Sequence, residues 1–190
     1  MQTSHVVRAK GQLPGNTMGF TLVELLVIVS IIAILTSAAV MSFVGSNQSG
    51  RDLERQVGLR ELETALESYR RIEGRYPEGC NGPDVWSTEQ DCFQYIEDFW
   101  PDYILNLPRD PQLRGDGTGF AYRTNTDGTV YKLMVRGTVE TEEVDGDHSL
   151  APCPERCGCD ETSSTYQTSF AVWGGFAEND SDTQDVVCRL

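Results

Sequence analysis

Histidine is scarce in this chain, which contains only His5 and His148. A Ser–His–Asp or Cys–His site needs a histidine as its base, and nothing around His148 recommends it for that role. No glycine-rich phosphate-binding motif with a lysine occurs either. We therefore expect no enzymatic activity, and we expect His148 to be solvated in its acidic loop.

Positive charge is also scarce. The 190 residues include 15 Lys and Arg against 29 Asp and Glu, a formal net charge of −14. Phosphate binding needs clustered Lys and Arg, so this balance argues against nucleic acid as a ligand of the acidic domain. An acidic surface keeps an exported protein soluble. The length fits one modest domain plus a membrane helix.

One long apolar run, residues 20–45, carries Glu24 as its single charge. A helix of that length can cross a hydrocarbon core of about 30 Å. A carboxylate within such a segment costs about 3 kcal/mol, so it needs a partner and marks a functional site. The preceding residues 1–19 include Arg8 and Lys10 and no acid, which places them in the cytoplasm and the acidic bulk outside.

The segment Gly19-Phe20-Thr21-Leu22-Val23-Glu24 closely resembles the processing signature of type IV prepilins and type II secretion pseudopilins. The resemblance implies that residues 1–19 are a leader, which a prepilin peptidase removes after Gly19. The new terminus would become N-methylphenylalanine at Phe20, and Glu24 would be the assembly residue. The implied partners are identical or homologous pilin subunits, an inner-membrane assembly platform and, before assembly, membrane lipid. The implied location is a single-pass inner-membrane protein that ends in a periplasmic or cell-surface filament.

The same segment has a physical interpretation of its own. Cleavage would free an amine at Phe20, about one helical turn from Glu24 of the same subunit. That amine could pair with this carboxylate or with Glu24 of a neighbouring subunit, which helps offset the desolvation of both charges. Two alternatives are an ordinary signal anchor with a stray polar residue and a secretory signal cut after Ser37-Ala38-Ala39.

Residues 46–76 are expected to continue the helix as an amphipathic one. The polar patch 46–50, between Gly45 and Gly50, is a break, a kink or only the membrane exit. Beyond it, Leu59, Leu62, Leu66 and Tyr69 repeat with helical spacing. Gly74 is typical of a C-cap, and Pro77 prevents continuation.

Residues 77–190 are expected to form an exported domain with a small antiparallel sheet. Thr126-Asp127-Gly128 predicts a hairpin between strands 120–125 and 129–135, and 169–173 predicts a further strand. Ser87 and Gln90 form a capping box that predicts a short helix containing Cys92. The predicted fold class is therefore α+β and pilin-like, with a long N-terminal helix packed on that sheet.

Six cysteines stand in this exported part: Cys80, Cys92, Cys153, Cys157, Cys159 and Cys188. Cysteines in an exported domain favour disulfides, and we predict a Cys80–Cys92 bond. The other four are expected to tie the tail to the sheet, with the connectivity left open, or alternatively to hold zinc.

No metal site residue is predicted, and no cofactor is expected apart from calcium as a candidate. The loops that supply hard oxygen ligands are Asp116-Gly117, Asp127-Gly128, Asp145-Gly146-Asp147 and the pair Asp180 and Asp182. A charge-rich loop is more often a solvated face, and no calcium loop of the pseudopilins has a clear counterpart here.

The resemblance implies a structural role, that of a subunit of a type IV pilus-like filament. The alternatives are a pseudopilin of a type II secretion or DNA-uptake machine and a membrane-anchored exported binding domain that never polymerises. Glu24 discriminates between these classes, because a mere anchor has no use for a carboxylate at that depth.

Overall fold

The computed structural model describes residues 19–141, 143–176 and 185–190, without the side chains of residues 38–42 and 44. The chain divides into two compact units, residues 1–42 and 43–190, and each is described by itself. The predicted leader, except Gly19, and the candidate calcium ligands Asp180 and Asp182 lie outside the described residues.

Helix α1 runs from Leu22 to Glu73, a length of 52 residues, and contributes to both units. The polar patch 46–50 is therefore not a break, because the helix continues through Gly45 and Gly50. Each glycine costs about 1 kcal/mol relative to alanine, but helical hydrogen bonding on both sides propagates through such isolated weak positions. The described part of the chain contains no helix with the length and hydropathy that a bilayer crossing requires.

The carboxyl end of α1 agrees with the sequence prediction. Gly74 follows the last helical residue with a left-handed φ of 81°, and its amide donates to the carbonyl of Arg70 at 2.9 Å. A residue with a Cβ avoids this conformation, so glycine stops the helix here. Arg70 and Arg71 lie in the last turn, where positive charge complements the helix dipole.

The sheet has four antiparallel strands in the order β1-β2-β3-β4, which is also their order along the chain. The strands are β1 (Ser87–Thr88), β2 (Gly119–Thr124), β3 (Val130–Arg136) and β4 (Phe170–Gly175). A short 3-10 helix, η1 (Glu155–Cys157), and a short helix, α2 (Ser164–Gln167), lie between β3 and β4. The predicted hairpin forms the turn between β2 and β3, where the Gly128 amide donates to Asn125 at 3.0 Å.

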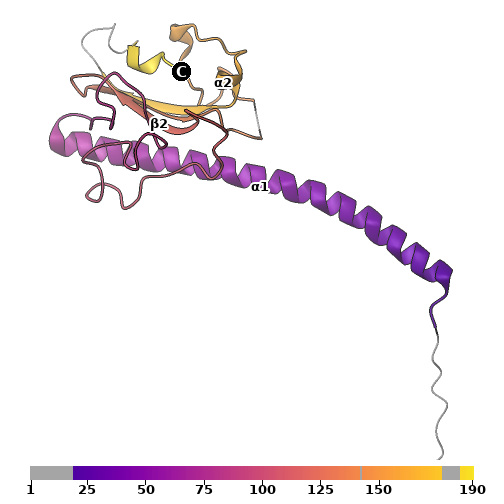
Figure 1. Cartoon of the computed structure of the whole chain (residues 1–190). Helices are drawn as coiled ribbons and strands as arrows, with labels where there is room; N and C mark the ends of the chain where they lie inside the picture. Colours follow the sequence, from indigo (N-terminus) through magenta and orange to yellow (C-terminus); the bar gives the residue numbers. More distant parts are fainter. Residues whose placement is uncertain (1–18, 142, 177–184) are drawn as a thin grey trace, which may run out of the picture. The chain divides into compact units, whose positions relative to one another are not determined.

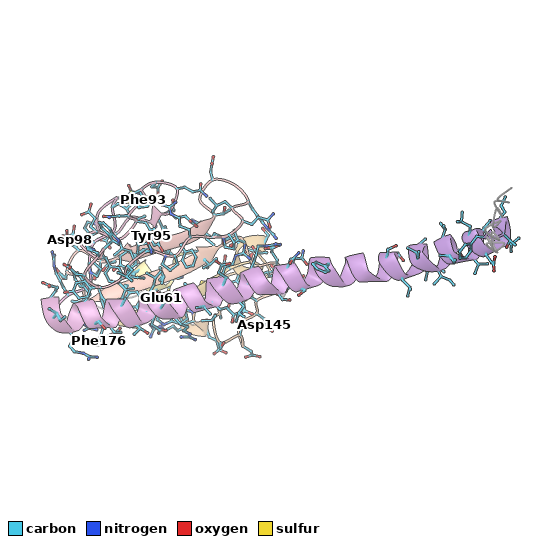
Figure 2. All side chains as sticks on the ribbon, turned by 90° about the horizontal axis from the view of Figure 1, so that it is seen from below. Glu61, Phe93, Tyr95, Asp98, Asp145 and Phe176 are labelled. Carbon is cyan, nitrogen blue, oxygen red and sulfur yellow. A yellow bond between two sulfur atoms is a disulfide. The ribbon has the colours of Figure 1, made fainter. Side chains whose placement is uncertain are left out.

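The main core of the second unit lies between α1 and one face of the sheet (Figure 1). The predicted helical stripe is buried, and Leu59, Leu62 and Leu66 are fully covered. The strands contribute the alternating residues that face the helix, and the segment between β1 and β2 adds aromatic side chains. The strands contribute Phe120, Tyr122, Tyr131, Leu133, Val135, Phe170 and Val172, and the segment contributes Tyr95 and Phe99. Tyr95 lies inside this segment, whereas Phe93 lies at its periphery and is 80% exposed (Figure 2).

The helix predicted from Ser87 is wrong, and Cys92 lies in no helix. Ser87 belongs to β1, and its Oγ accepts a hydrogen bond from the Asn81 amide at 3.0 Å. The Gln90 side chain, the other half of the expected capping box, donates instead to the carbonyls of Gly115 and Thr118 at 2.9 Å each. Both side chains are therefore engaged away from any helix end, and the backbone of Ser87 and Thr88 pairs with β2 instead.

The face of the sheet that lies away from α1 is also covered by the chain. Lys132 and Met134 are both fully buried. The carboxyl-terminal residues Val186 and Val187 pack there with Val130 and Trp173 in a second apolar cluster. Because this cover comes from a segment remote in sequence, periodicity within the strand could not reveal it.

Helix–sheet packing predicts a large difference between two substitutions on α1. Leu66→Ala should lower the free energy of unfolding by about 2–5 kcal/mol, because it opens a cavity in the buried core. Val57→Ala, on the exposed face where Val57 is 58% exposed, should change it by less than about 0.5 kcal/mol. Urea unfolding of the purified chain, followed by tyrosine and tryptophan fluorescence, measures both, and equal losses would contradict this packing.

Candidate functional site

The start of α1 brings the predicted processing and assembly residues together. Gly19 and Phe20 precede the helix, which begins at Leu22. Glu24 turns back over this end, and its Oε2 accepts hydrogen bonds from the Thr21 amide at 3.0 Å and from the Thr21 hydroxyl at 2.9 Å. The Thr21 Oγ1 in turn accepts from the Glu24 amide at 3.3 Å.

This reciprocal pair is a capping box, in which Thr21 and Glu24 satisfy backbone groups that the first helical turn leaves free. The carboxylate thus lies at the positive end of the helix dipole, beside the amide one residue after Phe20. Sequence reasoning singled out Glu24 but missed Thr21 as its partner. The signal was present, because threonine followed three residues later by glutamate is the capping-box pattern.

The first half of α1 exposes apolar side chains almost without interruption. Twelve of them are between 45% and 79% exposed: Phe20, Leu22, Val23, Leu25, Leu26, Val27, Ile28, Val29, Ile31, Ile32, Ile34 and Leu35. A soluble monomer rarely exposes a contiguous apolar surface of this extent, which marks a contact with a partner or a membrane. Glu24 is the single charge on that surface.

A second cluster, buried and ionic, fixes the second half of α1 to its domain. The fully buried guanidinium of Arg55 forms a two-pronged pair with Asp110, with both N–O distances at 2.8 Å. Its Nη1 also donates to Asp52 at 2.7 Å and to Glu140 at 3.0 Å. Arg51 adds a further two-pronged pair with Glu140, at 2.7 and 2.6 Å. We call these five residues the junction cluster.

The junction cluster joins three parts of the chain that are distant in sequence. Asp52 lies on α1, Asp110 follows Pro108 in the rigid turn before β2, and Glu140 follows β3. The Asp52 carboxylate also accepts hydrogen bonds from the amides of Glu140 and Thr141, at 3.0 and 2.8 Å. Every buried charge therefore has partners, which is the condition for such a cluster to be tolerated.

The charges of the junction cluster shift one another's protonation. Hydrogen bonds from Arg51 and Arg55 outweigh burial and lower the pKa of Glu140 to about 2. Burial disfavours the Arg55 cation, but its bonds to Asp110 and Glu140 outweigh that cost and raise its pKa. Both shifts favour the charged forms of Glu140 and Arg55, as expected for a structural ion-pair cluster.

All six cysteines form disulfides in this structure. The pairs are Cys80–Cys92, Cys153–Cys159 and Cys157–Cys188. The first is the predicted pair, and the other two supply the connectivity that the sequence left open. Because the four tail cysteines are joined in disulfides, they provide no thiolate ligands for zinc.

The described acidic loops supply no candidate calcium site. Among the residues that the structure describes, no group of three His, Cys, Asp or Glu side chains is placed to hold a metal ion. His148 is also not simply solvated, because its ring stacks on Phe170 with centroids 5.4 Å apart and its Nδ1 accepts from the Leu150 amide at 3.1 Å.

Comparison with known proteins identifies the family. Type II secretion system core protein G of Klebsiella pneumoniae is 32% identical over 96 residues, which cover 49% of this chain and 67% of that protein. The chain belongs to the type IV pilin and type II secretion pseudopilin family. Core protein G of Pectobacterium carotovorum is 29% identical over 102 residues, and type IV major pilin protein PilA of Myxococcus xanthus is 35% identical over 63 residues.

These matches cover only part of each pilin-like chain. The alignment spans 53% of this chain and 65%, just under two thirds, of the Pectobacterium relative, and it spans 33% of this chain and 29% of the Myxococcus pilin. No family model matches the sequence. No solved structure matches it significantly. The family assignment therefore rests on the sequence relatives, and the fold agrees with it.

The junction cluster predicts a specific loss of stability in acid. Glu140 has a lowered pKa in the folded chain, so its contribution is complete above the ordinary glutamate pKa of about 4.5 and is lost as pH falls toward about 2. Glu140→Gln should lower the free energy of unfolding at pH 7 and flatten its dependence on pH between these values. Glu61→Gln, on the exposed side of α1 (Figure 2), is the matched control and should leave the acid slope unchanged. Urea titrations from pH 2 to pH 7 measure this, and an unchanged slope in Glu140→Gln would contradict it.

Proposed function

We propose that this chain is a structural, non-catalytic subunit of a pilus-like or pseudopilus filament. In this proposal it is cut after Gly19, methylated on Phe20 and polymerised through the first half of α1. The observation that carries the proposal is a lone carboxylate, Glu24, capping the start of a helix whose surface is otherwise apolar and exposed. Family membership supports the same role.

The proposed assembly follows from the exposed apolar surface of the first half of α1. The exposed apolar surface gains about 25 cal/mol per Å² when it leaves water, and copies of the same helix offer matching apolar surface. A subunit that contacts its copies through two different patches builds an open helical filament rather than a closed ring when the rotation does not close. We propose that the helix first resides in the inner membrane, among lipid, where the prepilin peptidase and an assembly platform act on it.

Glu24 would give this association its register. After cleavage, the amine of Phe20 would stand next to the Thr21 amide that Glu24 already accepts from. Glu24 of one subunit would exchange part of this local cap for the amine of a neighbour, a charge-assisted bond in a medium of low dielectric. The junction cluster would then transmit the position of α1 to the domain that decorates the filament.

A type II secretion pseudopilus is the more specific candidate among such filaments. The core protein G relatives align over 94 to 102 residues of this chain, whereas the PilA relative aligns over 63.

The mature amino terminus tests the processing step. Intact-mass and fragment mass spectrometry of protein purified from its native membrane should identify N-methylphenylalanine at Phe20 as the first residue. A terminus at Met1, or one after Ala39, would reject the prepilin interpretation.

Two substitutions at one position test the assembly step. Glu24→Gln keeps an oxygen that can cap Thr21 but removes the charge, and Glu24→Ala removes both. If pairing with a neighbour's amine drives assembly, both variants should lose at least about tenfold of sheared or pelleted filament while remaining membrane-associated. Glu97→Gln, on an exposed loop residue, is the control for expression and export. Normal filament from Glu24→Gln would show that only the cap matters and would remove the charge-pairing step.

A further inference from the structure

The only lysine after residue 10 is a fully buried one, Lys132 on β3. Every other cation of the domain is arginine. Arginine remains charged in proteins, whereas lysine can lose its proton when it is buried. At this one buried position the chain therefore carries a cation that can become neutral.

The Lys132 amine has two acceptors, and both belong to the carboxyl-terminal segment. Its Nζ donates to the carbonyl of Val187 at 2.7 Å and to the carbonyl of Arg189 at 2.6 Å. A neutral amine has two hydrogens to donate, so these two carbonyls accept both of them. An ammonium has a third N–H, for which the described residues provide no hydrogen-bond partner.

The charged groups around Lys132 also oppose an ammonium. Arg123 on β2 is its direct cross-strand partner, and Arg136 lies four residues further along β3, on the same face as Lys132. On the carboxyl-terminal segment, Asp185 is bonded to Arg123 at 2.8 Å and to Arg189 at 2.6 Å, so its charge is already shared by two guanidiniums. Asp84 acts on Arg123 from the loop before β1. Burial, together with Arg136 and Arg123, lowers the pKa of Lys132 to about 7.

The carboxyl-terminal segment is held on the sheet by several independent ties. Figure 1 shows it on the side of the sheet opposite α1. Val186 and Val187 pack on Val130, the Arg136 guanidinium donates to the Leu190 carbonyl at 3.1 Å, and Cys188 is bonded to Cys157. The disulfide keeps the segment attached even when the noncovalent contacts open.

We propose that residues 185–190 form a strap that closes over the uncharged amine of Lys132 and is loosened when that amine takes up a proton. Closing the strap then requires the amine to release a proton at any pH between its pKa in the closed state, about 7, and its pKa in water. Opening returns the amine to water, where its ordinary pKa is about 10.4. The strap must consequently tighten as pH rises from about 7 toward that value, and it is at its loosest below about 7.

Hydrogen exchange of the strap in the full chain tests this dependence. The opening equilibrium of residues 186–190, corrected for the base-catalysed intrinsic rate, should fall about tenfold per pH unit between pH 7.5 and 9.5. Lys132→Met fills similar space without a titrating group, so opening of its strap should show no dependence on pH. A flat response in the unsubstituted chain, or a slope that persists in Lys132→Met, would overturn the proposal.

A direct titration keeps the test valid if Lys132→Met does not fold. Labelling with ¹⁵N-lysine gives side-chain signals from Lys10 and Lys132 alone. The Lys132 nitrogen should titrate below pH 8 and that of Lys10 above pH 9.5, and titration of both above 9.5 would reject the neutral amine.

Cys188→Ser should raise the opening of the strap and keep the pH slope. Replacing both Cys80 and Cys92 with Ser, which removes a disulfide elsewhere, should leave strap exchange unchanged, and a change there would show that the readout reports global unfolding.

Discussion

The pairing of Arg55 with its carboxylates is the interaction on which the arrangement of the domain depends. One fully buried guanidinium joins α1, the turn before β2 and the segment after β3. Removing any partner would leave an uncompensated charge in the interior, which is far more costly than the net value of the pair. The apolar core supplies most of the burial energy, but it specifies position less sharply than a guanidinium that must meet three carboxylates at once.

The long helix α1 has two different environments along one continuous element. From Leu59 onward it is buried against the sheet, whereas its first half offers apolar surface that residues of the same unit leave exposed. The unbroken passage through Gly45 and Gly50 connects these halves without a proline-directed bend.

Local patterns in the sequence predicted those features whose causes are local. The stripe from Leu59 to Tyr69, the glycine stop at Gly74 and the Asp127-Gly128 hairpin each rest on a few neighbouring residues, and the structure has all three. The helix expected at Ser87 is wrong because the Ser87 backbone pairs with β2, while the side chains of Ser87 and Gln90 bond to two loops. The burial of Lys132 and the contacts of Arg55 depend on segments more than 50 residues away, which no periodicity encodes.

The two disulfides of the tail interleave, since Cys157 lies inside the ring closed by Cys153 and Cys159 and is itself bonded to Cys188. The larger ring encloses α2 and β4, so the edge strand of the sheet is part of a covalent loop. Oxidation guided only by nearness along the chain would favour neighbours such as Cys157 and Cys159. Closing the Cys157–Cys188 bond costs less chain entropy once β4 has docked on β3, so formation of this disulfide is coupled to formation of the sheet.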